Sequence, residues 1–169
     1  MYRALKAGIP AKKIVFAGVG KTPGELRYAI ASGVHCINAE SVEELSMIDA
    51  LSREHGGVQK VALRINPDIV PHTHSYVATG KGDSKFGIDF GQARDVFKSR
   101  HLFEGLDICG IHLHVGSQLV KAEAFVKAIK RTLQFISAND ISLRLLNIGG
   151  GLGIVYHKEM PQTAQEYAR

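Results

Sequence analysis

The sequence predicts an α/β fold, specifically part of a (β/α)8 TIM barrel with about five of its eight strands. Short apolar runs alternate with amphipathic stretches along all 169 residues, as in repeated strand–helix units. The later strands also have one aliphatic face and one face that turns polar or glycine-rich at the carboxyl end. A sheet covered by helices on both sides should be apolar on both faces, so this asymmetry favours a barrel with its site at the C-terminal mouth.

The expected strands and helices follow from these patterns. The strands are expected at Ile14–Gly18, Val34–Asn38, Lys60–Asn66, Ile108–Gly116 and Leu143–Ile148. The helices are expected at Pro23–Ser32, Val42–His55, Gly91–Arg100, Ala122–Ala138 and Thr163–Arg169, with a short amphipathic helix at Met1–Gly8. Thr22 and Ser41 are each followed three residues later by a glutamate, which predicts a capping box at both helix starts.

A complete barrel of this kind needs eight strands and typically about 250 residues. We therefore expect residues 1–169 to form one incomplete barrel domain and to be a piece of a longer protein.

Composition excludes several classes of protein. The net charge of +5 is dispersed, and its densest cluster (Lys127, Lys130 and Arg131) has the spacing of a solvated helix face, so we expect no nucleic-acid binding. No apolar run reaches the roughly 18 residues of a membrane helix. Cys36 and Cys109 lie in apolar strand-like runs, which predicts buried reduced thiols and a cytoplasmic protein.

The run Gly149-Gly150-Gly151 directly follows an expected strand. Successive glycines let backbone amides converge on an anion without a Cβ in the way, and phosphate sites of such barrels form in the loops after the late strands. A tight turn that needs positive φ would explain one glycine rather than three. We therefore predict a phosphate-binding loop.

His112 and His114 alternate on the inner face of the strand Ile108–Gly116, and Ser117 follows it. His114 could stack on a flat heteroaromatic ring, and Ser117 could donate a hydrogen bond to a phosphate. Two alternatives stay open: the two histidines could bind a metal, or they could be structural, which suits His112 better than His114.

Arg64 lies on the inner face of the third strand. A buried unpaired charge costs several kcal/mol, so Arg64 must meet a carboxylate, a phosphate or a cofactor group. A structural ion pair and a ligand contact are both open. Lys85, in a glycine-rich loop, is a weaker candidate catalyst. Gly20-Lys21-Thr22 imitates a nucleotide-binding P-loop, but Val15 occupies the position of that motif's first glycine, so we reject it.

Five segments occur in an order that resembles one family. They are Gly18–Thr22, Leu63–Asp68, Ser84–Ile88, His114–Gln118 and Asn147–Ile154. Together they look like the pyridoxal-phosphate-dependent amino-acid decarboxylases of the alanine-racemase-like barrel group (fold type III), and within it the diaminopimelate-acting branch.

The resemblance implies roles for particular residues. His114 would stack on the pyridine ring of pyridoxal 5'-phosphate as the catalytic residue of this segment. Ser117, Gly149, Gly150 and Gly151 would hold the phosphate, and Arg64 would line the barrel near the ring. No metal is expected. The substrate would be a small amino acid, meso-2,6-diaminopimelate, converted to L-lysine and carbon dioxide.

The resemblance also implies missing parts. The family's Schiff-base lysine and its C-terminal β-domain match no residue of this chain, so we expect the chain alone to be inactive and the whole protein to be a homodimer with a shared active site. Three alternatives remain open: a decarboxylase of ornithine, arginine or a polyamine precursor, a non-enzymatic barrel of pyridoxal-phosphate homeostasis, and a metal-dependent hydrolase that uses His112 and His114.

Overall fold

The computed structural model describes residues 1–67 and 86–168. The chain divides into two compact units by its internal contacts. Unit 1 comprises Met1–Ile65, Phe86–His112 and Ser142–Asn147, and unit 2 comprises Asn66–Lys85, Leu113–Ile141 and Ile148–Arg169. Lys85 lies outside the described residues.

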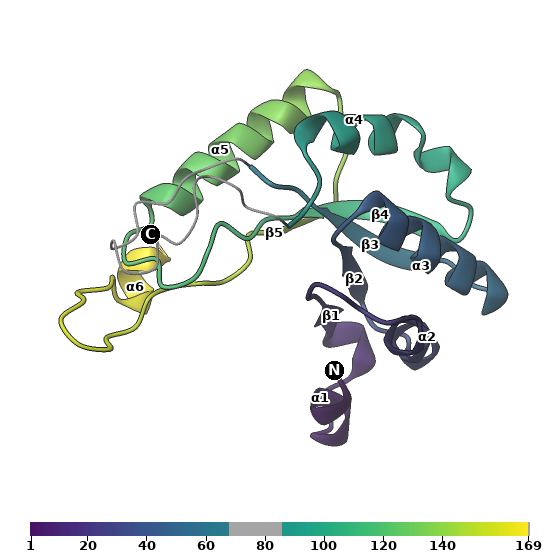
Figure 1. Ribbon diagram of the computed structural model, residues 1–169, viewed down its shortest axis with the longest axis horizontal. Coiled ribbons are helices and arrows are strands. Elements are labelled where there is room, and N and C mark those ends of the chain that lie inside the picture. The colour runs from purple at the N-terminus through teal and green to yellow at the C-terminus, as the bar shows by residue number, and fades with distance from the viewer. Residues whose placement is uncertain (68–85, 169) are drawn as a thin grey trace. The chain divides into compact units, whose positions relative to one another are not determined.

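Unit 1 is built on a five-stranded sheet in which every pair of neighbouring strands is parallel. The strands are β1 (Val15–Phe16), β2 (Cys36–Ala39), β3 (Gln59–Arg64), β4 (Leu106–His112) and β5 (Leu145–Asn147). Their spatial order is β1-β2-β3-β4-β5, so each strand lies beside the one before it (Figure 1). A doubly wound sheet reverses its strand order, whereas a barrel adds strands in sequence. The predicted partial barrel is confirmed.

Unit 1 also contains short or medium-length helices. They are α1 (Tyr2–Lys6), η1 (Ala11–Lys13), α2 (Pro23–Ser32), α3 (Val42–Glu54), α4 (Phe90–Lys98) and η2 (Arg100–Leu102). Of these, α2, α3 and α4 bury apolar residues. Leu26 and Ile30 of α2 and Leu45 and Ile48 of α3 are buried, as are the apolar strand residues Ile37, Leu63 and Ile111. The short helices η1 and η2 were not expected from the sequence.

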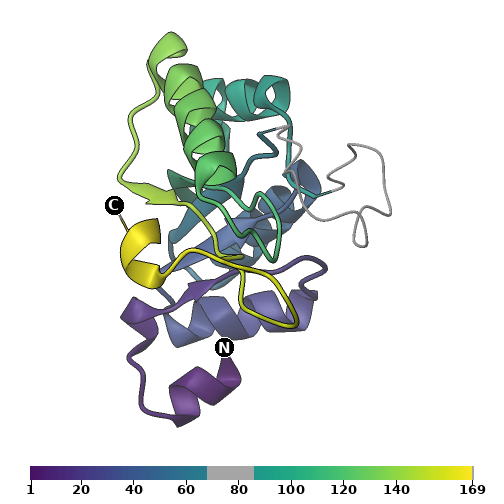
Figure 2. The ribbon, with the colours of Figure 1, turned by 90° about the vertical axis from the view of Figure 1, so that its left-hand side faces the viewer.

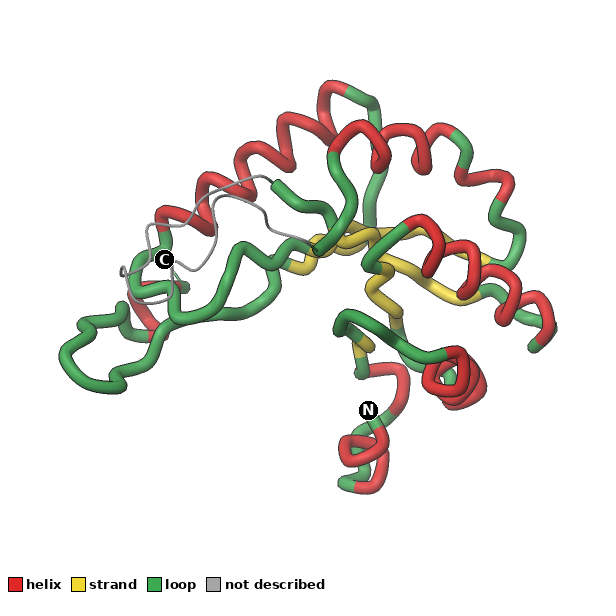
Figure 3. The backbone as a smooth tube through the Cα atoms, viewed as in Figure 1, coloured by secondary structure: helices red, strands yellow, loops and turns green. Residues whose placement is uncertain are grey.

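Unit 2 contains α5 (Glu123–Ala138) and α6 (Ala164–Tyr167) with their adjoining loops (Figures 2 and 3). The rings of Phe125 and Tyr167 meet edge to face with centroids 5.0 Å apart, so α6 packs on α5. No helix in the described ranges is both long and apolar enough to cross a membrane.

The register of the sheet arranges the inner face in two levels. Asn38 pairs with Ala62, Ala62 with Gly110 and Gly110 with Leu145. Two residues further along, Arg64 pairs with His112 and His112 with Asn147. A Cβ on Gly110 would lie 2.7 Å from the Leu145 carbonyl oxygen, so the lower level has no room for a side chain there.

β4 departs from its prediction at both its end and its alternation. The expected strand Ile108–Gly116 ends at His112, because its partner β5 ends at Asn147 and the ladder stops there. The register also shifts between Val61 and Ala62, which leaves Cys109 as an extra residue in β4. This bulge interrupts the simple alternation of side chains that the sequence predicts for the strand.

The two cysteines are buried and free, as expected. Interaction with the neighbouring Cys109 thiol, together with burial, raises the pKa of Cys36. The same interaction lowers the pKa of Cys109.

The two predicted capping boxes have different outcomes. Thr22 and Glu25 form a complete box at the start of α2. Ser41 accepts from the Glu44 N–H, but the Glu44 carboxylate accepts instead from the N–H of Glu40, which precedes the cap, and from Lys21. The prediction of a second capping box is therefore wrong, because the Glu44 carboxylate binds the charged Lys21 side chain instead of the backbone N–H of Ser41.

Candidate functional site

The glycine loop of unit 2 packs directly on the segment that carries His114 and Ser117. A Cβ on Gly149 would lie 2.3 Å from the Leu113 carbonyl oxygen and 3.2 Å from Nδ1 of His114. A Cβ on Gly151 would lie 1.9 Å from the Gly116 carbonyl oxygen. Both glycines also have positive φ, of 77° and 103°. Backbone proximity and conformation together explain why these two positions are glycine.

Gly150 differs from its two neighbours. A Cβ at this position would meet nothing within 4 Å, and its φ lies outside the left-handed region. Among the described residues, the N–H groups of Gly150 and Gly151 donate to no backbone carbonyl. Backbone whose φ alternates in sign can point successive N–H groups at one anion. The loop thus fits an anionic group that approaches Gly150 closely.

Hydrogen bonds with the preceding segment hold the end of the glycine loop. The Leu119 N–H donates to the Gly151 carbonyl at 2.8 Å, and the Gly153 N–H donates to Leu119 at 2.9 Å. The Gln118 amide donates to the Ile154 carbonyl at 2.9 Å and accepts from the Ile154 N–H at 3.0 Å. Sequence reasoning assigned Gln118 no role, although it directly follows Ser117.

His114 and Ser117 are partly accessible in unit 2. The His114 ring is half-buried next to Gly149, and Ser117 is exposed near Gly151. An imidazole and a hydroxyl beside a glycine loop offer one flat surface and several hydrogen-bond donors. These groups suit a flat ring that carries a phosphate.

Arg64 of unit 1 forms a buried ion pair with Glu40. Glu40 directly follows β2, on the strand next to Arg64. The Arg64 guanidinium also lies 5.7 Å from the ring centroid of Phe86. Of the two roles that the sequence allowed for Arg64, the structural ion pair is therefore present. Glu40 was missed because cross-strand neighbours are distant in sequence.

Some polar side-chain atoms in and beside this pair are buried without a hydrogen-bond partner among the described residues. They are the Asn38 amide and the second carboxylate oxygen of Glu40. Buried polar atoms are usually hydrogen-bonded, so both offer capacity for a water or a ligand group.

Lys21 lies in the segment that resembles a P-loop. Its ammonium group donates to Glu44 at 2.6 Å and to the Asn38 carbonyl oxygen at 2.8 Å. Its side chain is only 2% exposed. Lys21 is thus bound to protein groups, in agreement with the rejection of that motif.

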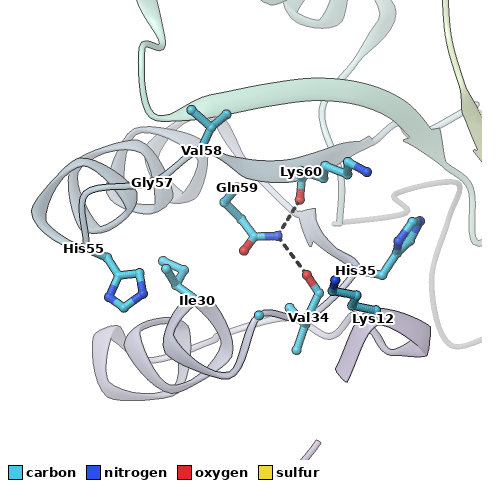
Figure 4. A pocket seen from close by; sticks show the side chains of 10 residues that line it. Lys12, Ile30, Val34, His35, His55, Gly57, Val58, Gln59 and Lys60 are labelled. Carbon is cyan, nitrogen blue, oxygen red and sulfur yellow. Dashed lines mark hydrogen bonds between the residues drawn. The ribbon is translucent and has the colours of Figure 1, made fainter. Parts of the chain in front are cut away.

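A hollow of about 370 Å³ lies at the opposite ends of the strands in unit 1. Figure 4 shows the amide of Gln59 directed at the carbonyls of Val34 and Lys60, with His35 and His55 further out. These residues adjoin the N-terminal ends of β2 and β3. The hollow is therefore separate from the ion pair of Arg64 and Glu40, which lies at the carboxyl ends of these strands.

Within residues 1–67 and 86–168, no three His, Cys, Asp or Glu side chains are grouped as a metal site requires. His112 is buried at the end of β4. This arrangement does not favour the metal-dependent hydrolase.

Comparison with known proteins defines the class. The family described as the pyridoxal-binding domain of pyridoxal-dependent decarboxylases matches residues 1–169. The chain belongs to this family, whose cofactor is pyridoxal phosphate, and the resemblance seen in the sequence is confirmed.

Individual members of this family show which branch the chain is similar to. The diaminopimelate decarboxylase of Vibrio cholerae is 42% identical over 99% of this chain, which covers 41% of that protein. The crystal structure of diaminopimelate decarboxylase from Helicobacter pylori complexed with L-lysine matches with a TM-score of 0.88 and 35% identity, over 99% of this chain and 43% of that one.

A more distant likeness is to the arginine decarboxylase of Paramecium bursaria Chlorella virus. Its TM-score is 0.72 and its identity 29%, over 89% of this chain and 39% of that one. The chain thus spans about two fifths of the length of the relatives it matches.

Proposed function

We propose that this chain is the cofactor-binding part of an enzyme that decarboxylates meso-2,6-diaminopimelate to L-lysine with pyridoxal 5'-phosphate. The observation that carries the proposal is the packing of the triple-glycine loop against His114 and Ser117. The diaminopimelate branch is favoured over decarboxylases of arginine by the higher identity to the Vibrio cholerae protein than to the viral arginine decarboxylase.

The proposed roles follow from the chemistry of each residue. Ser117 and the amides around Gly149, Gly150 and Gly151 hold the phosphate, since they supply donors to an anion. His114 lies against the pyridine ring and fixes its plane. When bound, the cofactor accepts the electron pair that remains on the substrate when carbon dioxide leaves.

Arg64 is proposed as a further cofactor-binding residue, at the end of β3. Its ion pair with Glu40 fixes the guanidinium, while its five donors exceed what one carboxylate needs. Arg64 can therefore hold a polar group and remain charge-compensated.

The whole protein is proposed to be a cytoplasmic homodimer with a shared active site, of which residues 1–169 form one incomplete barrel domain. The Schiff-base lysine and a β-domain would be supplied by the rest of the full-length protein. The chain expressed alone is then expected to release no carbon dioxide from diaminopimelate.

The test compares His114→Ala with the exposed control His101→Ala in the full-length gene product. Aromatic stacking is worth about 0.5–1.5 kcal/mol, so His114→Ala should weaken cofactor binding about two- to tenfold and slow turnover. Cofactor affinity is followed by visible absorbance, and carbon dioxide release is compared with diaminopimelate, ornithine and arginine. Unchanged affinity and turnover in His114→Ala, or a preference for ornithine or arginine, would refute the corresponding assignment.

A further inference from the structure

Four charged side chains form one buried cluster at the carboxyl ends of β2 and β3. Lys21 pairs with Glu44, and Arg64 pairs with Glu40. The four side chains are between 2% and 12% exposed, and their formal charges sum to zero.

The two ion pairs are joined through the backbone of β2. One oxygen of Glu44 accepts from Lys21 at 2.6 Å, and the other accepts from the Glu40 N–H at 2.9 Å. Lys21 also donates to the Asn38 carbonyl oxygen at 2.8 Å. Lys21 and Glu44 thus fix the peptides on both sides of Ala39, immediately before the carboxylate that holds Arg64.

Charge balance makes the two pairs depend on each other. Without Lys21, the buried cluster would hold two carboxylates and one guanidinium. A buried uncompensated charge is strongly unfavourable, so Glu44 would leave, take a proton or compete with Glu40 for Arg64. Each outcome releases the Glu40 peptide or redirects the guanidinium.

We propose that Lys21 is a positioning residue that sets the direction of Arg64 through Glu44 and Glu40. This proposal rests on the proposed function for the contact of Arg64 with the cofactor. The segment Gly20-Lys21-Thr22 is not a phosphate-binding loop. Under this proposal, its lysine supports the position of Arg64.

The test uses the full-length gene product and four variants: Lys21→Met, Lys21→Arg, Arg64→Lys and the double variant Lys21→Met/Arg64→Lys. Lys21→Met should weaken binding of pyridoxal 5'-phosphate roughly tenfold, as removal of a supporting residue commonly does, and Lys21→Arg should restore most of it. In the Arg64→Lys background, Lys21→Met should have little further effect, since residues that act through one another are not additive.

Arg27→Met is the matched control, because it removes another ion pair, that of Arg27 with Glu54, which joins α2 and α3 but is more than half exposed. It should leave cofactor affinity unchanged. Equal weakening by Lys21→Met in both Arg64 backgrounds, or equal loss in Arg27→Met, would overturn the proposal in favour of a general effect on folding.

A second readout needs no bound cofactor. Hydrogen exchange at the Glu40 amide should become at least about tenfold faster in Lys21→Met than in Arg27→Met, because Glu44 no longer holds it. Unchanged exchange would overturn the proposal even if cofactor binding falls. If Lys21→Met does not fold, Glu44→Ala tests the same link, because it removes the acceptor of the Glu40 N–H, with the same results expected. A protein that binds no pyridoxal 5'-phosphate would refute the proposed function, while the exchange result would still decide the link to Glu40.

Discussion

At the scale of single residues, the site combines positions that the sequence marks clearly with others that it hides. The glycine run and His114 stand out because their chemistry is unusual for their place after a strand. Glu40 and Lys21 are ordinary charged residues in the sequence, and only the pairing of β2 with β3 and the path of the chain before α2 bring them to Arg64 and Glu44. Local patterns therefore predict the loop but not the charges around it.

The three consecutive glycines should respond differently to alanine. Gly151→Ala should destabilise the full-length protein by at least about 2 kcal/mol, since left-handed φ alone costs about 1–2 kcal/mol and the new Cβ would collide with Gly116. Gly150→Ala has space and permitted φ, so its stability should change by less than about 1 kcal/mol while phosphate binding weakens. Denaturant unfolding and cofactor titration measure the two effects. Equal destabilisation by both variants would contradict the distinction.

At the scale of secondary structure, helix starts were predicted better than strand ends. α2 occupies the expected range Pro23–Ser32 because Thr22, Pro23 and Glu25 are local signals that act within one turn. β4 ends four residues early because its length depends on a partner strand elsewhere in the sequence. Capping is a local property, whereas the end of a ladder is not.

The capping box of α2 gives a test at this scale. Thr22→Ala should cost about 1 kcal/mol of stability, and Thr22→Ser should cost less because its hydroxyl can still cap. Hydrogen bonding from the Thr22 backbone lowers the pKa of Glu25 below its usual value, and the Thr22 hydroxyl adds to this shift. The stabilisation by Glu25 is therefore complete above its ordinary pKa and is lost as pH falls through the lowered one. NMR titration should show the Glu25 pKa rising in Thr22→Ala, and an unmoved value would contradict the role of the hydroxyl.

At the scale of the whole molecule, side-chain alternation correctly favoured a barrel, since the polar faces of β3 and β4 require a site on one side of the sheet. The division into two units was not predicted, because it depends on contacts between segments far apart in sequence. In the described part of the chain, β1 pairs only with β2, and β5 only with β4. Val15 and Leu146 on these outer strands are 37% and 36% exposed.

Open sheet edges with exposed apolar residues favour association. The 169-residue chain expressed alone should therefore form oligomers, and Val15→Lys combined with Leu146→Lys should reduce their size. Val58→Lys is the control, because Val58 is exposed but lies before β3. Light scattering during gel filtration measures the mass. A monomeric parent chain, or equal dispersal by Val58→Lys, would contradict association through the edges.

The pair His112–Asn147 is the last rung between β4 and β5. Up to that pair, a substitution disturbs hydrogen bonds that two strands share, so the scaffold tolerates little change there. After this pair, the segments that follow β4 and β5 are loops, where changes of length and composition are better tolerated. The residues that determine recognition can thus vary after this boundary without disturbing the framework before it.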